Sequence, residues 1–320
     1  MKAALTLKTN PVHTPIPDNR FIEEVACNLC GSLTSTVAYS GKLERLSNIY
    51  RVTDHALGTH YRIVRCRNCQ LLYCSPRPTL DELMKFYKKL EDPAYITESE
   101  GRIQSAIALV SDLERYVSGG KLLELGSACG FFLKVARDAG FQVAGIEPSE
   151  WARKYAMDNF GLALLGDPIQ RQDFPDEYFD AVCLFDVVEH FDNPRETFIE
   201  IARVTKPGGI LYLSTPDAQS WLALLLGRYW WGLQEAHLFY FSRQTIARML
   251  CMTGFETLAV HPFSREFTLA YWRSKLKGYS QVLYRLLAPL AWGPVGRLRL
   301  RLSFFDQMLV VARKKEGSHV

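Results

Sequence analysis

The sequence lacks any long hydrophobic run. In its 320 residues, no charge-free apolar stretch reaches the roughly 20 residues that are needed to span a bilayer. The segment 1–18 is polar and contains prolines, so it has no apolar core of a signal peptide. We therefore expect a loose tail over residues 1–20, a shorter one over residues 315–320, and a protein that stays in the cytoplasm.

One phosphate-binding motif is also missing. The chain has no Gly-x-Gly-x-x-Gly loop to receive the pyrophosphate of a dinucleotide, which argues against a nicotinamide-dependent dehydrogenase. A mainly disordered protein is excluded because 48% of the residues are hydrophobic. A chain of this length holds one α/β core and a smaller module.

Acidic residues are scarce in one segment of the chain. Between Phe263 and Ser303, eight Lys or Arg residues accompany a single acid, Glu266. The segment is therefore +7, and because the chain totals +4, the remainder is about −3. Its apolar residues recur at helical spacing, whereas residues 297–302 alternate as in a strand. We interpret 263–303 as a basic amphipathic insertion, which either lies on anionic lipid or is the solvated face of a packed helix.

The richest chemical signal is the stretch Leu122–Gly130, which reads LLELGSACG. It predicts a buried strand that ends at Glu124, a loop from Gly126 to Gly130, and then a helix. Such a loop lets a ligand approach bare backbone at the N-terminus of the helix. The spacing does not suit a pyrophosphate. It suits a cationic amino acid and a ribose, which the Glu124 carboxylate can receive.

More strands follow in the order of an α/β fold. The stretch Phe141–Ile146 predicts a second strand, and Glu147 follows it at the place where ribose hydroxyls are bound in such folds. A further strand, Phe179–Phe185, precedes Asp186, and a glycine turn precedes the strand 210–214. We therefore expect a mainly parallel sheet with its ligand at the carboxyl ends of the strands.

Four motifs, ELGSACG, GIEPS, FDAVCLFDVVEH and KPGGILYLSTP, resemble those of class I S-adenosylmethionine-dependent methyltransferases. The resemblance covers about residues 119–262 and the last strand. It implies a Rossmann-like α/β domain over residues 119–314, with a seven-stranded sheet and S-adenosylmethionine as cofactor. The cofactor-binding residues that it implies are Glu124, Gly126, Ser127, Ala128, Gly130, Glu147, Pro148, Asp173, Phe174, Phe185, Asp186 and His190.

Ala128 departs from the family, which usually has a second loop glycine at this position. We expect its methyl group to be a small obstruction that leaves cofactor binding intact. If it does block the cofactor, the protein is an inactive scaffold.

Half of the eight cysteines form two Cys-x-x-Cys pairs, Cys27 with Cys30 and Cys66 with Cys69. Disulfides are not expected in the cytoplasm, and four thiolates suffice for a closed tetrahedral zinc site. A closed site leaves no position for substrate, so we expect structural Zn2+ in a module over residues 21–80. The alternative is four buried, unpaired cysteines.

The stretch 66–78 resembles the zinc module of deoxysugar C-methyltransferases and their uncharacterised relatives. In these relatives a segment with spaced tyrosines packs over the cofactor. The resemblance implies that residues 81–118 form a helical linker or lid, and that Tyr87 and Tyr95 are candidate active-site residues. The alternative is a connecting helix with two aromatic anchors.

His237 is the candidate general base. It precedes Ser242, a suitable N-cap for the next helix, and therefore lies near the carboxyl edge of the sheet. The sugar C-methyltransferases have a Glu-His pair at about this place. Here Ala236 separates Glu235 from His237, so the histidine carries over better than the glutamate. The alternative role for His237 is a structural hydrogen bond.

Together these patterns predict a methyltransferase of small molecules, most simply of a sugar or lipid-linked glycan intermediate in polysaccharide biosynthesis. O, N and C acceptors stay open. An RNA methyltransferase would account for the zinc module and the basic insertion. However, the strand before Asp186 ends in Phe-Asp-Val-Val and lacks the Asn-Pro-Pro signature of many base-amino methylases, so nucleic acid is not expected.

Overall fold

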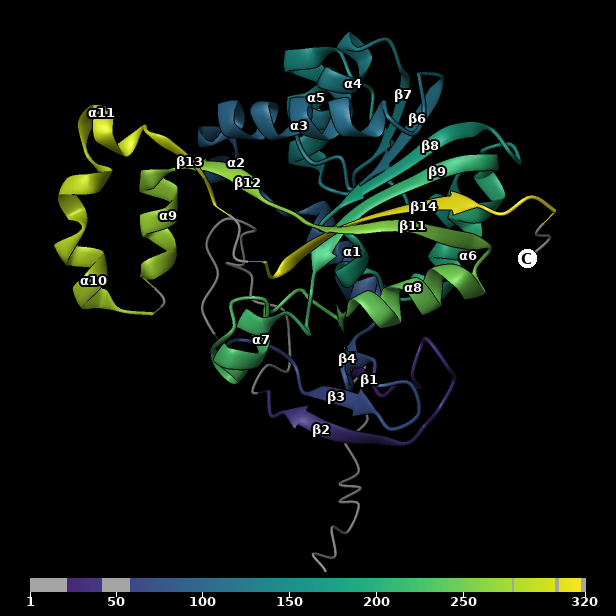
Figure 1. Ribbon diagram of the computed structural model, residues 1–320, viewed down its shortest axis with the longest axis horizontal. Helices are drawn as coiled ribbons and strands as arrows, with labels where there is room; N and C mark the ends of the chain where they lie inside the picture. The colour runs from purple at the N-terminus through teal and green to yellow at the C-terminus, as the bar shows by residue number, and fades with distance from the viewer. Residues whose placement is uncertain (1–21, 42–57, 278, 303–304, 318–320) are drawn as a thin grey trace, which may run out of the picture.

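The computed structural model describes residues 22–41, 58–277, 279–302 and 305–317, and the predicted tail over residues 1–20 lies outside them. A central sheet carries helices on both faces (Figure 1). A cysteine-bearing module adjoins one face, and a helical insertion projects from one side of the molecule (Figure 1). Among the described residues, none of the helices combines the length and the apolar character needed to cross a bilayer.

Six strands of the described chain form the central sheet, in the order β11-β14-β9-β8-β6-β7. Their bounds are Lys121–Leu125 (β6), Gln142–Ile146 (β7), Phe179–Phe185 (β8), Thr205–Pro216 (β9), Phe255–Pro262 (β11) and Gln307–Lys314 (β14). Strands β7, β6, β8 and β9 are parallel, and β14 is antiparallel to both neighbours. The chain order reverses between β6 and β8, and ligands bind at such a switch point.

The Rossmann-like α/β class predicted from the sequence is confirmed, but the expected seven-stranded sheet has six strands in the described chain. The missing edge strand is reduced to one parallel bridge between Leu165 and Ile146. It is short because Gly161, with a φ of +63°, ends the preceding helix and Pro168 soon follows.

Helices cover the two faces because neighbouring strand residues point in opposite directions. Leu122 packs in the core beneath α3 and α4, whereas Leu123 packs in the core on the other face. Figure 1 shows α3, α4 and α5 together on one side of the sheet and α6 and α8 on the other. The bounds are Ser99–Leu113 (α3), Phe131–Asp138 (α4), Glu150–Phe160 (α5), Pro194–Val204 (α6) and Arg243–Met252 (α8).

The N-terminal module is joined to the methyltransferase-like domain by a shared sheet. Its strands are Ser35–Tyr39 (β2), Ile63–Cys66 (β3) and Leu72–Cys74 (β4), with a separate pair formed by Ile22–Glu23 (β1) and Arg77–Pro78 (β5). Strand β10, Phe239–Tyr240, pairs antiparallel with β4 although more than 160 residues separate them. The module therefore extends directly to the segment that carries His237.

The four cysteines of the two Cys-x-x-Cys pairs meet in this module. Their sulfurs lie within 4.8 Å of one another. The Sγ atoms of Cys27 and Cys69 are 3.4 Å apart, and those of Cys30 and Cys66 are 3.5 Å apart. Zinc at ~2.3 Å from each of four thiolates separates the sulfurs by about 3.8 Å. The cluster therefore has the donor set and the spacing that suit a tetrahedral zinc ion.

Between β11 and β14 the chain forms the predicted insertion. It contains a two-stranded sheet, Arg265–Thr268 (β12) with Arg299–Leu302 (β13), so the alternating stretch is a strand in the structure. The helical part is broken into Leu269–Leu276 (α9), Gln281–Leu286 (α10) and Gly293–Gly296 (α11). Pro289, which follows α10, accounts for the second of these breaks, because proline cannot continue a helix.

We expect the purified protein to contain one zinc ion per chain. Replacing one ligand with the weaker hydroxyl donor in Cys27→Ser should lower the zinc content far below this ratio. The exposed Cys251 lies outside the cluster, so Cys251→Ser is the matched control. This variant should still contain one zinc ion per chain. Elemental analysis gives the ratio, and wild-type protein without stoichiometric zinc would contradict the prediction.

Candidate functional site

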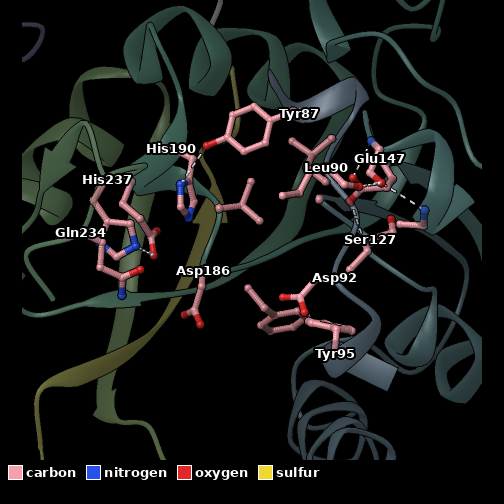
Figure 2. A pocket seen from close by; sticks show the side chains of 18 of the residues that line it. Tyr87, Leu90, Asp92, Tyr95, Ser127, Glu147, Asp186, His190, Gln234 and His237 are labelled. Atoms are coloured by element: carbon pink, nitrogen blue, oxygen red, sulfur yellow. Dashed lines mark hydrogen bonds and ion pairs between the residues drawn. The ribbon is translucent and has the colours of Figure 1, made fainter. Parts of the chain in front are cut away.

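A cavity of about 1470 Å³ opens at the carboxyl ends of β6, β7 and β8. Its remaining walls come from the segment before α3, the insertion, and α7, Trp221–Leu226. Figure 2 shows His190, His237 and Gln234 on one side of this cavity and Ser127 and Glu147 on the other. The cavity thus brings the predicted cofactor residues and the predicted base to one space.

The glycine loop turns sharply between β6 and α4. Gly126, Ala128 and Gly130 all have left-handed backbone, with φ of +70°, +45° and +78°. A Cβ on Gly126 would lie 2.4 Å from a methyl carbon of Val187, so glycine is required there. At Ala128 the cost is conformational, about 1–2 kcal/mol for a non-glycine residue in this region. The expected obstruction by its methyl group is therefore better described as backbone strain.

Two buried carboxylates flank this loop. Glu147 accepts hydrogen bonds from the backbone N–H groups of Ala128 and Ser149, both at 2.8 Å. Oε2 of Glu124 is buried and has no hydrogen-bond partner in the part of the chain that the structure describes. Burial raises the pKa of both groups, and the charge of Glu147 raises the pKa of Glu124 further. A ligand that brings positive charge or hydrogen-bond donors would offset the free-energy cost of burying these two carboxylates.

Not every predicted cofactor residue reaches the cavity. Those that line it are Glu124, Gly126, Ser127, Ala128, Glu147, Pro148, Phe185, Asp186 and His190. Gly130 lies outside it and allows α4 to pack on α5, because a Cβ there would lie 3.1 Å from Ala156. Asp173 is exposed, and the ring of Phe174 packs on Phe179 with centroids 5.1 Å apart. Residues 166–170, which run into the 3-10 turn Ile169–Arg171, line this part of the cavity instead.

The tyrosine segment before α3 covers part of the cavity. It consists of α1, Leu80–Lys88, and α2, Pro93–Thr97. The Ser149 hydroxyl donates to the Leu90 carbonyl at 2.7 Å and so ties the segment to the end of β7. Tyr95 lines the cavity and stacks on Phe131, with centroids 6.1 Å apart. Tyr87 places its hydroxyl 3.1 Å from Nδ1 of His190.

His190 and His237 lie side by side on the other wall, with ring centroids 4.8 Å apart. Nδ1 of His190 is 2.8 Å from the Ala236 carbonyl, and burial lowers the pKa of His190 to about 4. Nδ1 of His237 is 2.9 Å from the Gly232 carbonyl, so Nδ1 carries the proton. In the neutral ring this leaves Nε2 as the basic nitrogen.

Glu189 was missed from the sequence and lies against His237. It belongs to the 3-10 turn Val188–His190, and its Oε1 is 4.0 Å from Nε2 of His237. Its other carboxylate oxygen accepts a hydrogen bond from the Thr215 hydroxyl at 2.9 Å. In the sequence, only its position next to His190 in the motif DVVEH could have indicated that Glu189 belongs to the site.

The structure does not bring Glu235 to the cavity with His237. Glu235 is buried, and it is absent from the described residues that line the cavity. Its charge acts on Tyr61 of the N-terminal module, whose pKa is raised mainly by burial and then by Glu235.

The family described as "Methyltransferase domain" matches residues 95–260, just over half of the chain. Ubiquinone biosynthesis O-methyltransferase of Thiobacillus denitrificans is 30% identical over 125 residues, which are 36% of this chain and 53% of that protein. An uncharacterized methyltransferase of Mycobacterium leprae is 32% identical over 116 residues, 34% of this chain and 43% of the relative. The chain thus spans about half, or less, of these curated relatives.

Among solved structures, an S-adenosylmethionine-dependent methyltransferase from Archaeoglobus fulgidus aligns with a TM-score of 0.49 and 18% identity. The alignment covers 70% of this chain and all of that one. The matching region of the family includes the glycine loop, Glu147, Glu189 and His237. On the match over more than half of its length, this chain belongs to the methyltransferase domain family.

Proposed function

We propose that the protein transfers a methyl group from S-adenosylmethionine to a small-molecule acceptor. The observation that carries this proposal is the buried carboxylate pair at the glycine loop, in the same cavity as His237. Oε2 of Glu124 lacks a hydrogen-bond partner among the residues that the structure describes. S-adenosylmethionine would supply an activated methyl group on a cationic sulfur. Its charge and hydroxyl groups match what the two carboxylates require.

Glu124 and Glu147 would hold different parts of this cofactor. Glu124 would receive the cationic amino acid, because its buried oxygen has no other donor. Glu147 would accept from the ribose hydroxyls. Each of its oxygens already accepts one backbone N–H, and a carboxylate oxygen retains a further lone pair for a second donor.

His237 would act as the general base when the acceptor has to lose a proton. The Gly232 carbonyl holds its Nδ1 proton and so presents Nε2 in the basic form. The cavity wall around it would fix the acceptor relative to the methyl group, which is the main demand of an in-line displacement. The proton leaves the acceptor for Nε2. Tyr87 and His190 would shape the pocket, and Tyr95 would close it over the cofactor.

We propose a sugar or lipid-linked glycan intermediate as acceptor. A cavity with Gln234, Asp186 and Asp92 in its wall offers several hydrogen-bond partners to a hydroxylated head group. Its size suits a small molecule. The relative from Thiobacillus denitrificans is named for O-methylation in ubiquinone biosynthesis, which agrees with a small-molecule acceptor in general. The cysteine cluster would hold a structural zinc ion outside the cavity in which methyl transfer would take place.

We also propose a cytoplasmic protein in peripheral contact with an anionic membrane. An apolar surface, here called the rim, surrounds the insertion side of the cavity. Its exposed members are Trp221, Leu224, Leu225 and Tyr229 around α7, and Val282, Leu283 and Leu286 on α10. The two parts touch, because the Tyr279 hydroxyl donates to the Tyr229 carbonyl at 3.0 Å.

The rim has the chemistry of a lipid-binding surface. The outer side of α7 is exposed, with Leu225 at 72%, while Leu222 on its inner side lines the cavity. Exposed cations flank these apolar residues: Arg228, Lys277, Arg285 and Arg297. Apolar side chains with adjacent cations suit an anionic interface, and an acceptor with a lipid tail would enter the cavity from there.

Glu147→Ala should weaken binding of S-adenosylhomocysteine or S-adenosylmethionine by on the order of 10-fold or more. A hydrogen bond to a charged group contributes roughly 1.5–3 kcal/mol. The exposed carboxylate of Glu150 in the same region provides the control Glu150→Ala, which should bind as the wild type does. Titration calorimetry measures both, and equal affinities for the wild type and Glu147→Ala would contradict the assignment.

His237→Ala should lower methyl transfer by roughly 10²–10⁴-fold, as expected for loss of a general base, with cofactor affinity nearly unchanged. Labelled methyl transfer into low-molecular-mass, lipid-extractable and RNA fractions of a cell extract measures the rate and identifies the acceptor class. The exposed His261 gives the control His261→Ala. If His237→Ala keeps its rate but melts at a lower temperature, His237 is a structural hydrogen-bonder.

The double variant Trp221→Ser, Leu225→Ser should lose most of its binding to vesicles that contain anionic lipid. The wild type should bind these vesicles better than neutral ones, and the difference should fade as salt is raised. Met157→Ser on α5 removes a comparably exposed apolar side chain elsewhere and should change nothing. Equal sedimentation of the wild type with anionic and neutral vesicles would exclude the electrostatic part of this contact.

A further inference from the structure

We propose that Glu189 is a positioning residue for His237, and that the two side chains share one proton as a pair. This inference rests on the proposed methyl transfer, because it concerns the residue that would accept the proton. The acidic partner that we assign to His237 is thus Glu189, which lies in a different segment from Glu235, the partner that the resemblance implied.

The geometry of Glu189 singles it out. Its side chain is 1% exposed, and its Oε1 has no hydrogen-bond partner among the described residues. A buried carboxylate in this state is costly unless a positive charge or a donor lies close by. The basic nitrogen of His237, at 4.0 Å, is the ionisable group in ion-pair distance of that oxygen.

Hydrogen bonds to neighbouring groups hold both side chains of the pair in place. The Thr215 hydroxyl of β9 donates to Oε2 of Glu189 and so fixes the carboxylate plane. The Gly232 carbonyl takes the Nδ1 proton of His237. Leu238 donates its backbone N–H to the Glu189 carbonyl at 2.8 Å, which fixes the distance between the two segments. The pair is therefore set by the fold before any acceptor arrives.

The carboxylate acts on the protonated state of His237. When Nε2 takes a proton from an acceptor, the imidazolium gains the attraction of a negative charge about 4 Å away in a site shielded from water. No other proton or electron has to be supplied. The step starts from the pair that has lost its shared proton. It forms the Nε2–H bond and breaks the acceptor–H bond, and Glu189 is ionised before and after it.

The other ionisable groups near His237 are less suited than Glu189 to stabilise its protonated form. His190 is neutral over the physiological range because burial lowers its pKa to about 4. Tyr87 faces His190, and the Tyr240 ring lies 6.2 Å from that of His237. Glu235, in the same loop as His237, is directed toward the module and Tyr61. Burial raises the pKa of Glu189 itself to about 8, so the pair should lose its shared proton near that pH.

The test is a pH titration of the full-length protein with ¹³C-labelled histidine, which needs no acceptor. The resonance of His237 is assigned from its loss in His237→Ala. In the wild type it should show a step near pH 8 that belongs to the pair. In Glu189→Gln this step should vanish, and the remaining titration should lie at least about one pH unit lower, since tenfold in proton affinity is one pKa unit.

Glutamine keeps the shape of the side chain and its contact with Thr215, and Thr215→Val gives a second variant in which the carboxylate loses one support. Thr215→Val should shift the step of the pair in the opposite direction, to higher pH, because the Thr215 hydroxyl stabilises the ionised carboxylate and lowers the pKa of Glu189. The exposed His261 should titrate identically in all proteins. S-adenosylhomocysteine binding and melting temperature check the fold of each variant.

A His237 titration that is the same in wild type and Glu189→Gln would overturn the inference, whatever the enzyme's activity. Absence of methyl transfer by the wild type, with the pair titrating as expected, would instead overturn the proposed function alone. Where an acceptor is found, Glu189→Gln should lower kcat by about 10- to 100-fold with little change in KM, because the interaction is made with the protonated base.

Discussion

The backbone of Leu238 joins the two parts of the protein, and the geometry of the site depends on it. Its carbonyl accepts from the N–H of Cys74 in the cysteine module, and its N–H donates to the carbonyl of Glu189 after β8. The residue before it is His237, whose own carbonyl accepts from the Cys74 thiol. The cysteine module therefore holds the proposed base against the sheet, and disruption of the cysteine cluster should change the geometry of the cavity.

The two walls of the cavity present complementary chemistry. On the glycine-loop side, Glu124 and Glu147 are carboxylates that burial makes costly without a cationic or donor ligand. On the opposite side, His237 and Glu189 form a group able to take up one proton. In the proposed reaction, a cationic methyl donor would bind at the first wall and an acceptor at the second, and the cavity would align the two.

The sequence predicted the parts whose signals are local. The short apolar run within Lys121–Leu125 and the glycines of the following loop predict a strand and a turn from local sequence alone. The pairing of β10 with β4 could not be predicted from the sequence, because a strand of two residues shows no hydrophobic periodicity. Glu189 was overlooked for a related reason: the 3-10 turn, not the spacing, aims it at His237. Asp173 and Phe174 lie outside the cavity lining, because the chain beside β7 reaches the cavity earlier, at residues 166–170.

The most direct test of the account is a crystal structure of the protein with bound S-adenosylhomocysteine. The account predicts the ribose at Glu147, the amino group at Glu124, and the sulfur facing the wall that carries His190 and His237. A ligand bound elsewhere would contradict it. So would a ligand whose sulfur points away from that wall, because the carboxylates and the proposed base would then not serve one reaction.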